Sequence, residues 1–168
     1  MSGKDFREPK DFRQPYESLV GVWNGLGQVF DIDGKNLGAL PIMAVIYWLD
    51  EDTLLYRQSR PTISAQRGLL LTIKSFWEQF ELKVTGRLAR GGNERLDVKG
   101  MNGLAGEYYF QLRRRDGSGV HYNHHVFKGP DHRTVYGPLV DSEGETDLVI
   151  TTEFTRVSYT VSQHEKEL

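Results

Sequence analysis

Apolar and polar residues alternate over short stretches of this chain, and turn-forming residues separate the stretches. In residues 80–85 and again in 147–154, apolar side chains recur at every second position or close to it. A period of two is that of a β-strand with one face on a core and the other in water. The pattern predicts strands over residues 20–31, 41–50, 53–59, 67–76, 79–87, 94–100, 106–115, 119–128, 133–140 and 146–159.

The turns between these stretches indicate how the strands connect. Asp33-Gly34 and Asn102-Gly103 supply the positive φ values that tight hairpins need, so consecutive strands are expected to pair. A sheet built this way either closes on itself or leaves long exposed edges. The expected fold is therefore all-β, a single antiparallel up-and-down barrel of about eight to ten strands, with a packed sandwich as the alternative.

The two ends of the chain differ from this pattern. A short helical turn is expected around residues 15–20, where Pro15 suits a first helical position. Residues 1–14 are expected to form a flexible lead-in, residues 15–161 the barrel domain, and residues 162–168 a flexible tail. No apolar segment typical of a secretory signal is visible near the start, so a cytoplasmic location is expected.

Composition and charge narrow the function classes. A length of 168 residues suits one domain, and no apolar stretch is long enough for a membrane-spanning helix. The net charge of −2 lacks the basic excess typical of nucleic-acid binding. Because there is no cysteine, disulfides, thiol nucleophiles and thiolate zinc sites are excluded. We expect no nucleic-acid or membrane partner, and either a monomer or a homodimer.

The first predicted strand carries a recognisable motif. Residues 19–27 read Leu-Val-Gly-Val-Trp-Asn-Gly-Leu-Gly, with Gly21 and Trp23 in a Gly-x-Trp arrangement. This resembles the opening of the calycin superfamily, which contains the lipocalins, the fatty-acid-binding proteins and the nitrobindin-like barrels, and the spacing is most similar to the nitrobindin-like branch. The resemblance implies a ligand-binding barrel that begins with a short helical turn.

Such barrels often have an Arg or Lys late in the last strand that packs on this tryptophan, and here Arg156 stands in that place. The resemblance thus implies a structural role for Gly21, Trp23 and Arg156, in which the guanidinium lies over the indole and binds backbone carbonyls. The alternative is that Arg156 is an ordinary solvated residue. Gly25 and Gly27 either allow the strand to bend or leave room for a ligand against the backbone.

Three of the five histidines lie in residues 121–125, His-Tyr-Asn-His-His. Successive side chains of a strand point to opposite faces. Together with the flanking valines, Tyr122 and His124 form the more apolar set, so we expect these two inside the barrel and His121 and His125 outside. A shift of one residue would reverse this orientation. No third ligand at suitable spacing accompanies the outer histidines, so no metal site is expected.

The inward faces of the other strands supply a candidate ligand site. Apolar walls with a few hydroxyls and one imidazole suit an apolar, aromatic or polycyclic ligand. The sequence therefore predicts an intracellular small-molecule-binding barrel. The expected ligand-binding residues are Trp48, Tyr56, Leu71, Phe80, Tyr108, Phe110, Tyr122, His124, Tyr136 and Ile150.

A cofactor-independent enzyme is the competing hypothesis. A closed apolar barrel can fold a flexible substrate and exclude water, as a cyclase, isomerase or decarboxylase of a secondary metabolite would require. His124 and Tyr122 would then be the catalytic acid–base pair. Nitrobindin-like proteins hold haem through a His near the C-terminal strand, but residues 148–152 contain none. No cofactor is therefore expected, and haem is the lesser alternative.

Overall fold

The computed structural model describes the backbone of residues 14–51, 53–60, 63–76, 81–88, 96–102, 107–114 and 116–167, with side chains for residues 16–51, 53–59, 107–114 and 116–166. Its elements, in chain order, are α1 (Gln14–Glu17), β1 (Gly21–Phe30), β2 (Asn36–Trp48), β3 (Thr53–Arg60), β4 (Ile63–Phe76), β5 (Glu81–Leu88), β6 (Leu96–Asn102), β7 (Glu107–Arg114), β8 (Gly119–Gly129), β9 (His132–Asp141), β10 (Thr146–Ser158) and α2 (Gln163–Glu167).

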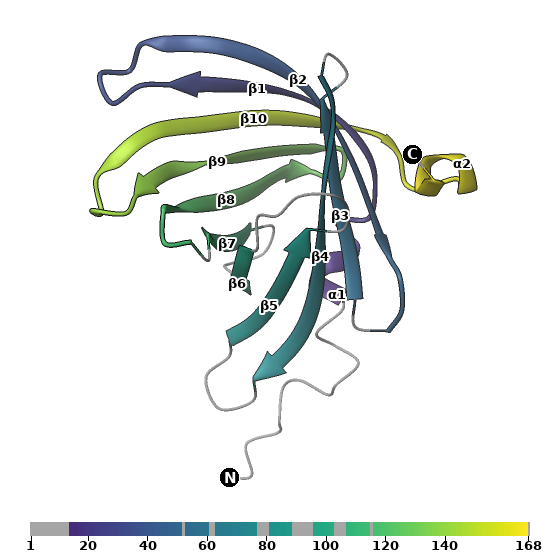
Figure 1. Ribbon diagram of the computed structural model, residues 1–168. Coiled ribbons are helices and arrows are strands. Elements are labelled where there is room, and N and C mark those ends of the chain that lie inside the picture. The colour runs from purple at the N-terminus through teal and green to yellow at the C-terminus, as the bar shows by residue number, and fades with distance from the viewer. Residues whose placement is uncertain are drawn as a thin grey trace, which may run out of the picture.

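The strands of the described residues form one antiparallel sheet in the order β5-β4-β3-β2-β1-β10-β9-β8-β7-β6. Consecutive strands are neighbours, and the first strand pairs with the last. The sheet curls strongly about one face (Figure 1), and its two end strands, β5 and β6, approach to within 8 Å between Cα atoms. The predicted all-β, up-and-down barrel with a short N-terminal helical turn is confirmed.

Two strands start several residues earlier than the sequence predicted. β2 begins at Asn36 rather than near residue 41, and β4 at Ile63 rather than near 67. Pro41 was interpreted as a strand start, yet it lies inside β2, opposite Leu26 of β1. Among the described pairings, β3 meets β2 only from Met43 onward, so Pro41 has a partner strand on one side. Proline is tolerated at such an edge because fewer ladder hydrogen bonds depend on its missing N–H.

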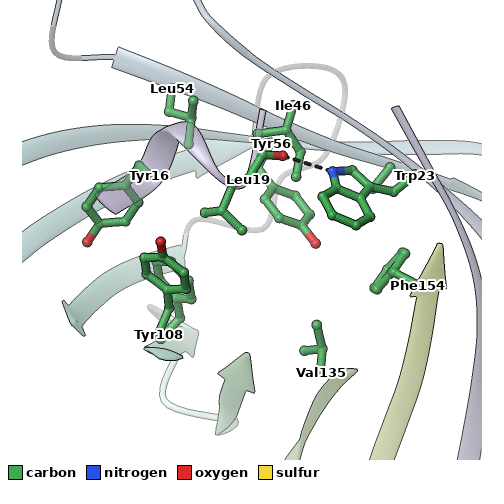
Figure 2. Close-up of a cluster of buried hydrophobic side chains, with 11 residues drawn as sticks. Tyr16, Leu19, Trp23, Ile46, Leu54, Tyr56, Tyr108, Val135 and Phe154 are labelled. Carbon is green, nitrogen blue, oxygen red and sulfur yellow. Dashed lines mark hydrogen bonds between the residues drawn. The ribbon is translucent and has the colours of Figure 1, made fainter. Parts of the chain in front are cut away.

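The helical turn α1 closes one end of the barrel. Tyr16 and Leu19 are fully buried there, and the Trp23 Nε1–H donates to the Leu19 carbonyl at 2.9 Å. In Figure 2, Leu19 lies between the ring of Tyr16 on one side and the rings of Tyr56 and Trp23 on the other. The buried apolar cluster comprises Tyr16, Leu19, Trp23, Ala44, Ile46, Leu54, Tyr56, Tyr108, Phe110, Val135 and Phe154.

The glycines of β1 allow this packing. A Cβ on Gly25 would lie 2.6 Å from the Phe154 ring, and one on Gly27 would lie 2.9 Å from Ile42 Cδ1. The room that these two glycines leave is therefore occupied by side chains of the barrel itself. Of the two interpretations made from the sequence, a wall thinned for a ligand does not fit these contacts, and strand bending stays a prediction.

Residues 163–167 form the short helix α2, which the sequence did not predict. Ser162 and Glu165 cap it reciprocally: the Ser162 N–H donates to Glu165 Oε2 at 2.7 Å, and the Glu165 N–H donates to Ser162 Oγ at 3.2 Å. Arg57 of β3 donates to the carbonyls of Glu165 and Lys166, which attaches the helix to the barrel. The flexibility of the lead-in and of the tail stays a prediction.

Among the described helices, neither is long and apolar enough to cross a membrane.

Candidate ligand site inside the barrel

Strand register decides which side chains share the inner face. Trp23 lies opposite Arg156 and Ala44, and Phe154 lies opposite Gly25 and Arg133. Since residues directly opposite one another in an antiparallel pair point the same way, these side chains all face inward. The same rule, carried across β9 and β8, brings Val135 and His125 to the inner face.

Burial along the inner face changes from one end of the barrel to the other. On β10, Phe154 and Thr152 are buried, whereas Ile150 is partly exposed. On β8, His125 is buried, whereas His121 is partly exposed. Among the described residues, the inner face is therefore most buried near α1 and less buried toward the other end of the barrel.

Arg156 lies over the indole of Trp23, with 4.0 Å from its guanidinium carbon to the ring centroid. Its Nη2 donates to the carbonyls of Ser18 at 2.7 Å and Pro130 at 2.9 Å, and its Nη1 donates to the Val20 carbonyl. These contacts tie β10 to the segment after α1. The predicted contact between Trp23 and Arg156 is thus present, and every guanidinium nitrogen of Arg156 has a partner.

Gly21 begins β1 with a φ of 136°. A Cβ at this position would overlap the Ser158 carbonyl oxygen. The place of Gly21 beside the Arg156 contacts is consistent with the structural role that the resemblance implied.

A second arginine, Arg133 of β9, lies in the same cluster. Its guanidinium carbon is 4.6 Å from the ring centroids of both Trp23 and Phe154, and 5.6 Å from that of Tyr56. The side chain is 0% exposed, and its Nη2 donates to the Tyr56 hydroxyl at 3.3 Å. Its Nε and Nη1 have no hydrogen-bond partner among the residues that the structure describes. Burial lowers the pKa of Arg133 from its usual value, with the nearby Tyr56 and Tyr108 acting in the opposite direction.

Two histidines of β8 also face inward. His125 is 4% exposed, its ring meets that of Phe110 edge-on with centroids 5.0 Å apart, and its Nδ1 has no partner. Burial, and next the charge of Arg133, lowers its pKa well below the ordinary value. Burial, and next Arg114, lowers the pKa of His121 to about 4. Both imidazoles are therefore neutral at neutral pH.

The orientation predicted for β8 was wrong. Tyr122 is 42% exposed and His125 is buried, so His121 and His125 lie inside, while Tyr122 and His124 lie outside. The hairpin between β7 and β8 places His125 opposite Tyr108, whose side chain is in the core. Pairing therefore overrode the local count of apolar residues, and the short turn at residues 116–118 was the signal that could have found it.

On the outer face, His124 stacks on Tyr109 with ring centroids 4.2 Å apart, and its Nε2 lies 3.3 Å from Glu107 Oε2. Tyr136, also predicted to line the interior, lies beside this cluster and is 41% exposed. Aromatic and imidazole rings cover one another there, which explains why an apolar composition did not indicate the inner face. The expected lining role of Tyr122, His124 and Tyr136 is corrected accordingly.

Of the other predicted lining residues, five lie in or near the interior, and two have side chains that the structure does not describe. Tyr56, Tyr108 and Phe110 are buried in the core cluster, Trp48 packs against it, and Ile150 lies on the inner face toward the open end. The side chains of Leu71 and Phe80 lie outside the described residues. Sequence reasoning missed Arg133, although its spacing from Val135, two residues along the same strand, was a signal that the two share a face.

Among the described residues, no three His, Cys, Asp or Glu side chains gather closely enough to hold a metal ion.

No family model matches the chain, and no curated protein matches its sequence. Among solved structures it is similar to the S-type phycobiliprotein lyase CPES from Guillardia theta, with a TM-score of 0.60 and 12% identity, over 94% of this chain and 96% of that one. It is also similar to a DUF3598-family protein of unknown function from Nostoc punctiforme, with a TM-score of 0.60 and 15% identity, over 83% of this chain. The chain spans about half the length of that protein, 48%. These likenesses show a lipocalin-like antiparallel barrel fold.

Proposed function

We propose that this chain is an intracellular small-molecule-binding barrel that holds an apolar, aromatic or polycyclic ligand against its inner face. The observation that carries the proposal is an inner wall of aromatic side chains that contains buried nitrogens of Arg133 and His125 with no partner among the described residues. Natural folds satisfy nearly all buried polar groups, so such groups on an inner face are typical of a site that a ligand completes.

The burial gradient gives the direction of entry. The end near α1 is closed by Tyr16 and Leu19, and the inner face becomes partly exposed toward Ile150. A ligand would therefore enter from the end away from α1 and reach the aromatic cluster with its leading group. The lipocalin-like fold of the CPES lyase is compatible with this role, and the ligand itself is argued from the side chains of this chain.

Binding is favoured over catalysis by the position of the predicted acid–base pair. His124 and Tyr122 lie on the outer face, so the enzyme hypothesis loses the two residues on which it depended. The inward imidazole of His125 is neutral at neutral pH, because burial lowers its pKa, and it lies among aromatic rings. In this position the imidazole of His125 can orient a bound ligand.

A fluorescent neutral probe, pyrenebutanol, tests the proposal. The wild-type protein should bind it saturably, as measured by fluorescence anisotropy. Ile150→Trp narrows the open end from the inner face, whereas the matched control Thr151→Trp places the same bulk on the outer face, beside Tyr136. We expect the first variant to weaken binding about tenfold and the second to leave it unchanged. Absence of saturable binding, or equal loss in both variants, would contradict the proposal.

A further inference from the structure

Trp23 has two arginines over its ring, and their hydrogen bonds differ. Arg156 donates to three backbone carbonyls and lies 3.5 Å from Asp131 Oδ1. Arg133 makes the same kind of ring contact, yet two of its nitrogens have no acceptor in the described part of the chain. The barrel's own backbone therefore satisfies the hydrogen-bond donors of Arg156, whereas it does not satisfy those of Arg133.

Among the described residues, the side chain that accepts from Arg133 is Tyr56. The Tyr56 hydroxyl accepts from Arg133 and also from Gln58 Nε2 at 3.2 Å, and no acceptor for its own proton is found among the described residues. No aspartate or glutamate of the described chain is buried. Among the described residues, the buried end of the barrel thus offers the N–H groups of two guanidinium nitrogens and one hydroxyl proton, and no carboxylate faces them.

An unpaired buried guanidinium is costly, because arginine stays protonated in proteins and loses its hydration on burial. Stacking on Trp23 and Phe154 offsets part of that cost but leaves the N–H groups unsatisfied. An acceptor that carries a negative charge would both neutralise the buried positive charge and accept hydrogen bonds from the free N–H groups. A planar carboxylate also matches the fork of a guanidinium.

We propose that Arg133 is the anchor for a carboxylate group of the bound ligand, with the Tyr56 hydroxyl as a second donor. This inference rests on the proposed function, and it adds the ligand's chemical class and orientation. The carboxylate lies deepest, near Trp23 and α1, and the aromatic part of the ligand extends along the inner face past His125 toward Ile150. The ligand is thus an aromatic or polycyclic carboxylic acid rather than a neutral hydrocarbon.

Two probes with the same ring system separate this inference from the proposed function. Pyrenebutanoate carries a carboxylate where pyrenebutanol carries a hydroxyl. In the wild-type protein, we expect pyrenebutanoate to bind about tenfold or more tightly than pyrenebutanol, since a hydrogen bond to a charged group adds that much. The preference should persist in high salt, because a buried pair is little screened.

Arg133→Met is the decisive variant. It should lose the preference, so that the two probes bind within about twofold of each other. Because the variant removes an unpaired buried charge and fills the space with an apolar chain, its urea midpoint should stay unchanged or rise. Lys128→Met, which removes an exposed lysine paired with Glu153, is the control and should keep the preference.

Tyr56→Phe gives a second test that preserves the ring. It should reduce the preference for pyrenebutanoate over pyrenebutanol several-fold. A preference that survives in Arg133→Met, or a wild-type protein that binds both probes equally, would overturn the anchor and leave the proposed function standing. A wild-type protein that binds neither probe would overturn both.

Discussion

Gly137 is the residue at which a single missing side-chain atom matters most for the sheet. It lies in β9, and a Cβ at this position would overlap the carbonyl oxygen of Tyr122 in β8. The obstacle is backbone, which cannot rotate away as a flexible side chain could. Glycine at this place therefore allows two neighbouring strands to approach on the wall that also carries His121 and His125.

We expect Gly137→Ala to lower the free energy of unfolding by about 2–4 kcal/mol, because the strands must move apart to admit the methyl group. Urea unfolding followed by tryptophan fluorescence measures this loss. The control is Gly144→Ala, at a turn with a φ of 89° and nothing within 4 Å of the added Cβ. The control should lose only about 1 kcal/mol, from the backbone conformation alone. Equal losses in the two variants would show that the contact with Tyr122 is unimportant.

At the scale of elements, α1 shows how tertiary contacts define a helical turn. Its four residues are too few to be stable alone. It is held by the burial of Tyr16 and Leu19, by the Trp23 Nε1–H bond to Leu19, and by Arg156, which donates to carbonyls on the segment that follows it. The closed end of the barrel thus depends on a residue at the far end of the chain.

Arg156→Lys tests that dependence. Lysine keeps the positive charge but has one ammonium group, which cannot reach the carbonyls of Ser18, Val20 and Pro130 together. We expect a loss of about 2–4 kcal/mol in the free energy of unfolding, since carbonyls are left without partners. Lys128→Met, at an exposed ion pair, should lose less than about 1 kcal/mol in the same urea titration. A loss in Arg156→Lys as small as that of the control would rule out the proposed attachment.

At the scale of the whole molecule, the inward turn of β8 makes folding stability depend on pH. His121 and His125 both have pKa values lowered by burial from the ordinary 6.5, to about 4 for His121. Below pH 6.5 the unfolded chain therefore binds protons at these positions that the folded barrel does not. The contribution of these neutral histidines to the free energy of unfolding is fully present above pH 6.5 and is lost as the pH falls from 6.5 toward 4.

Urea unfolding measured between pH 7 and pH 5 should show this loss, with each neutral imidazole contributing a slope of up to about 1.4 kcal/mol per pH unit. The double variant His121→Asn/His125→Asn should have a much flatter slope, whatever its absolute stability. His132→Asn, at an exposed imidazole, is the control and should keep the slope due to the two inward histidines. A slope unchanged in the double variant would place both histidines outside the barrel.

Several features follow from the sequence alone. The alternation of apolar residues and the Asp-Gly and Asn-Gly turns determine local strands and short connections, which is enough for a sheet of consecutive antiparallel strands. The order that the structure shows adds the pairing of β1 with β10. The contact of Trp23 with Arg156 was implied by the resemblance of residues 19–27 to the calycin opening, and the register of β1 and β10 places the two residues opposite each other. In each case the information is local or lies in a motif.

The orientation of β8 and the burial of Arg133 were decided only by the tertiary structure. The more apolar face of residues 120–127, which carries Val120, Tyr122 and Val126, is the outer one, so local composition indicated the wrong face. Pairing with β7, whose Tyr108 and Phe110 are in the core, decided the orientation. An arginine is ordinarily expected in solvent, and Arg133 is buried because its register partner Phe154 and the ring of Trp23 enclose it. Such environments are assembled from strands far apart in the chain, and no single stretch of sequence contains them.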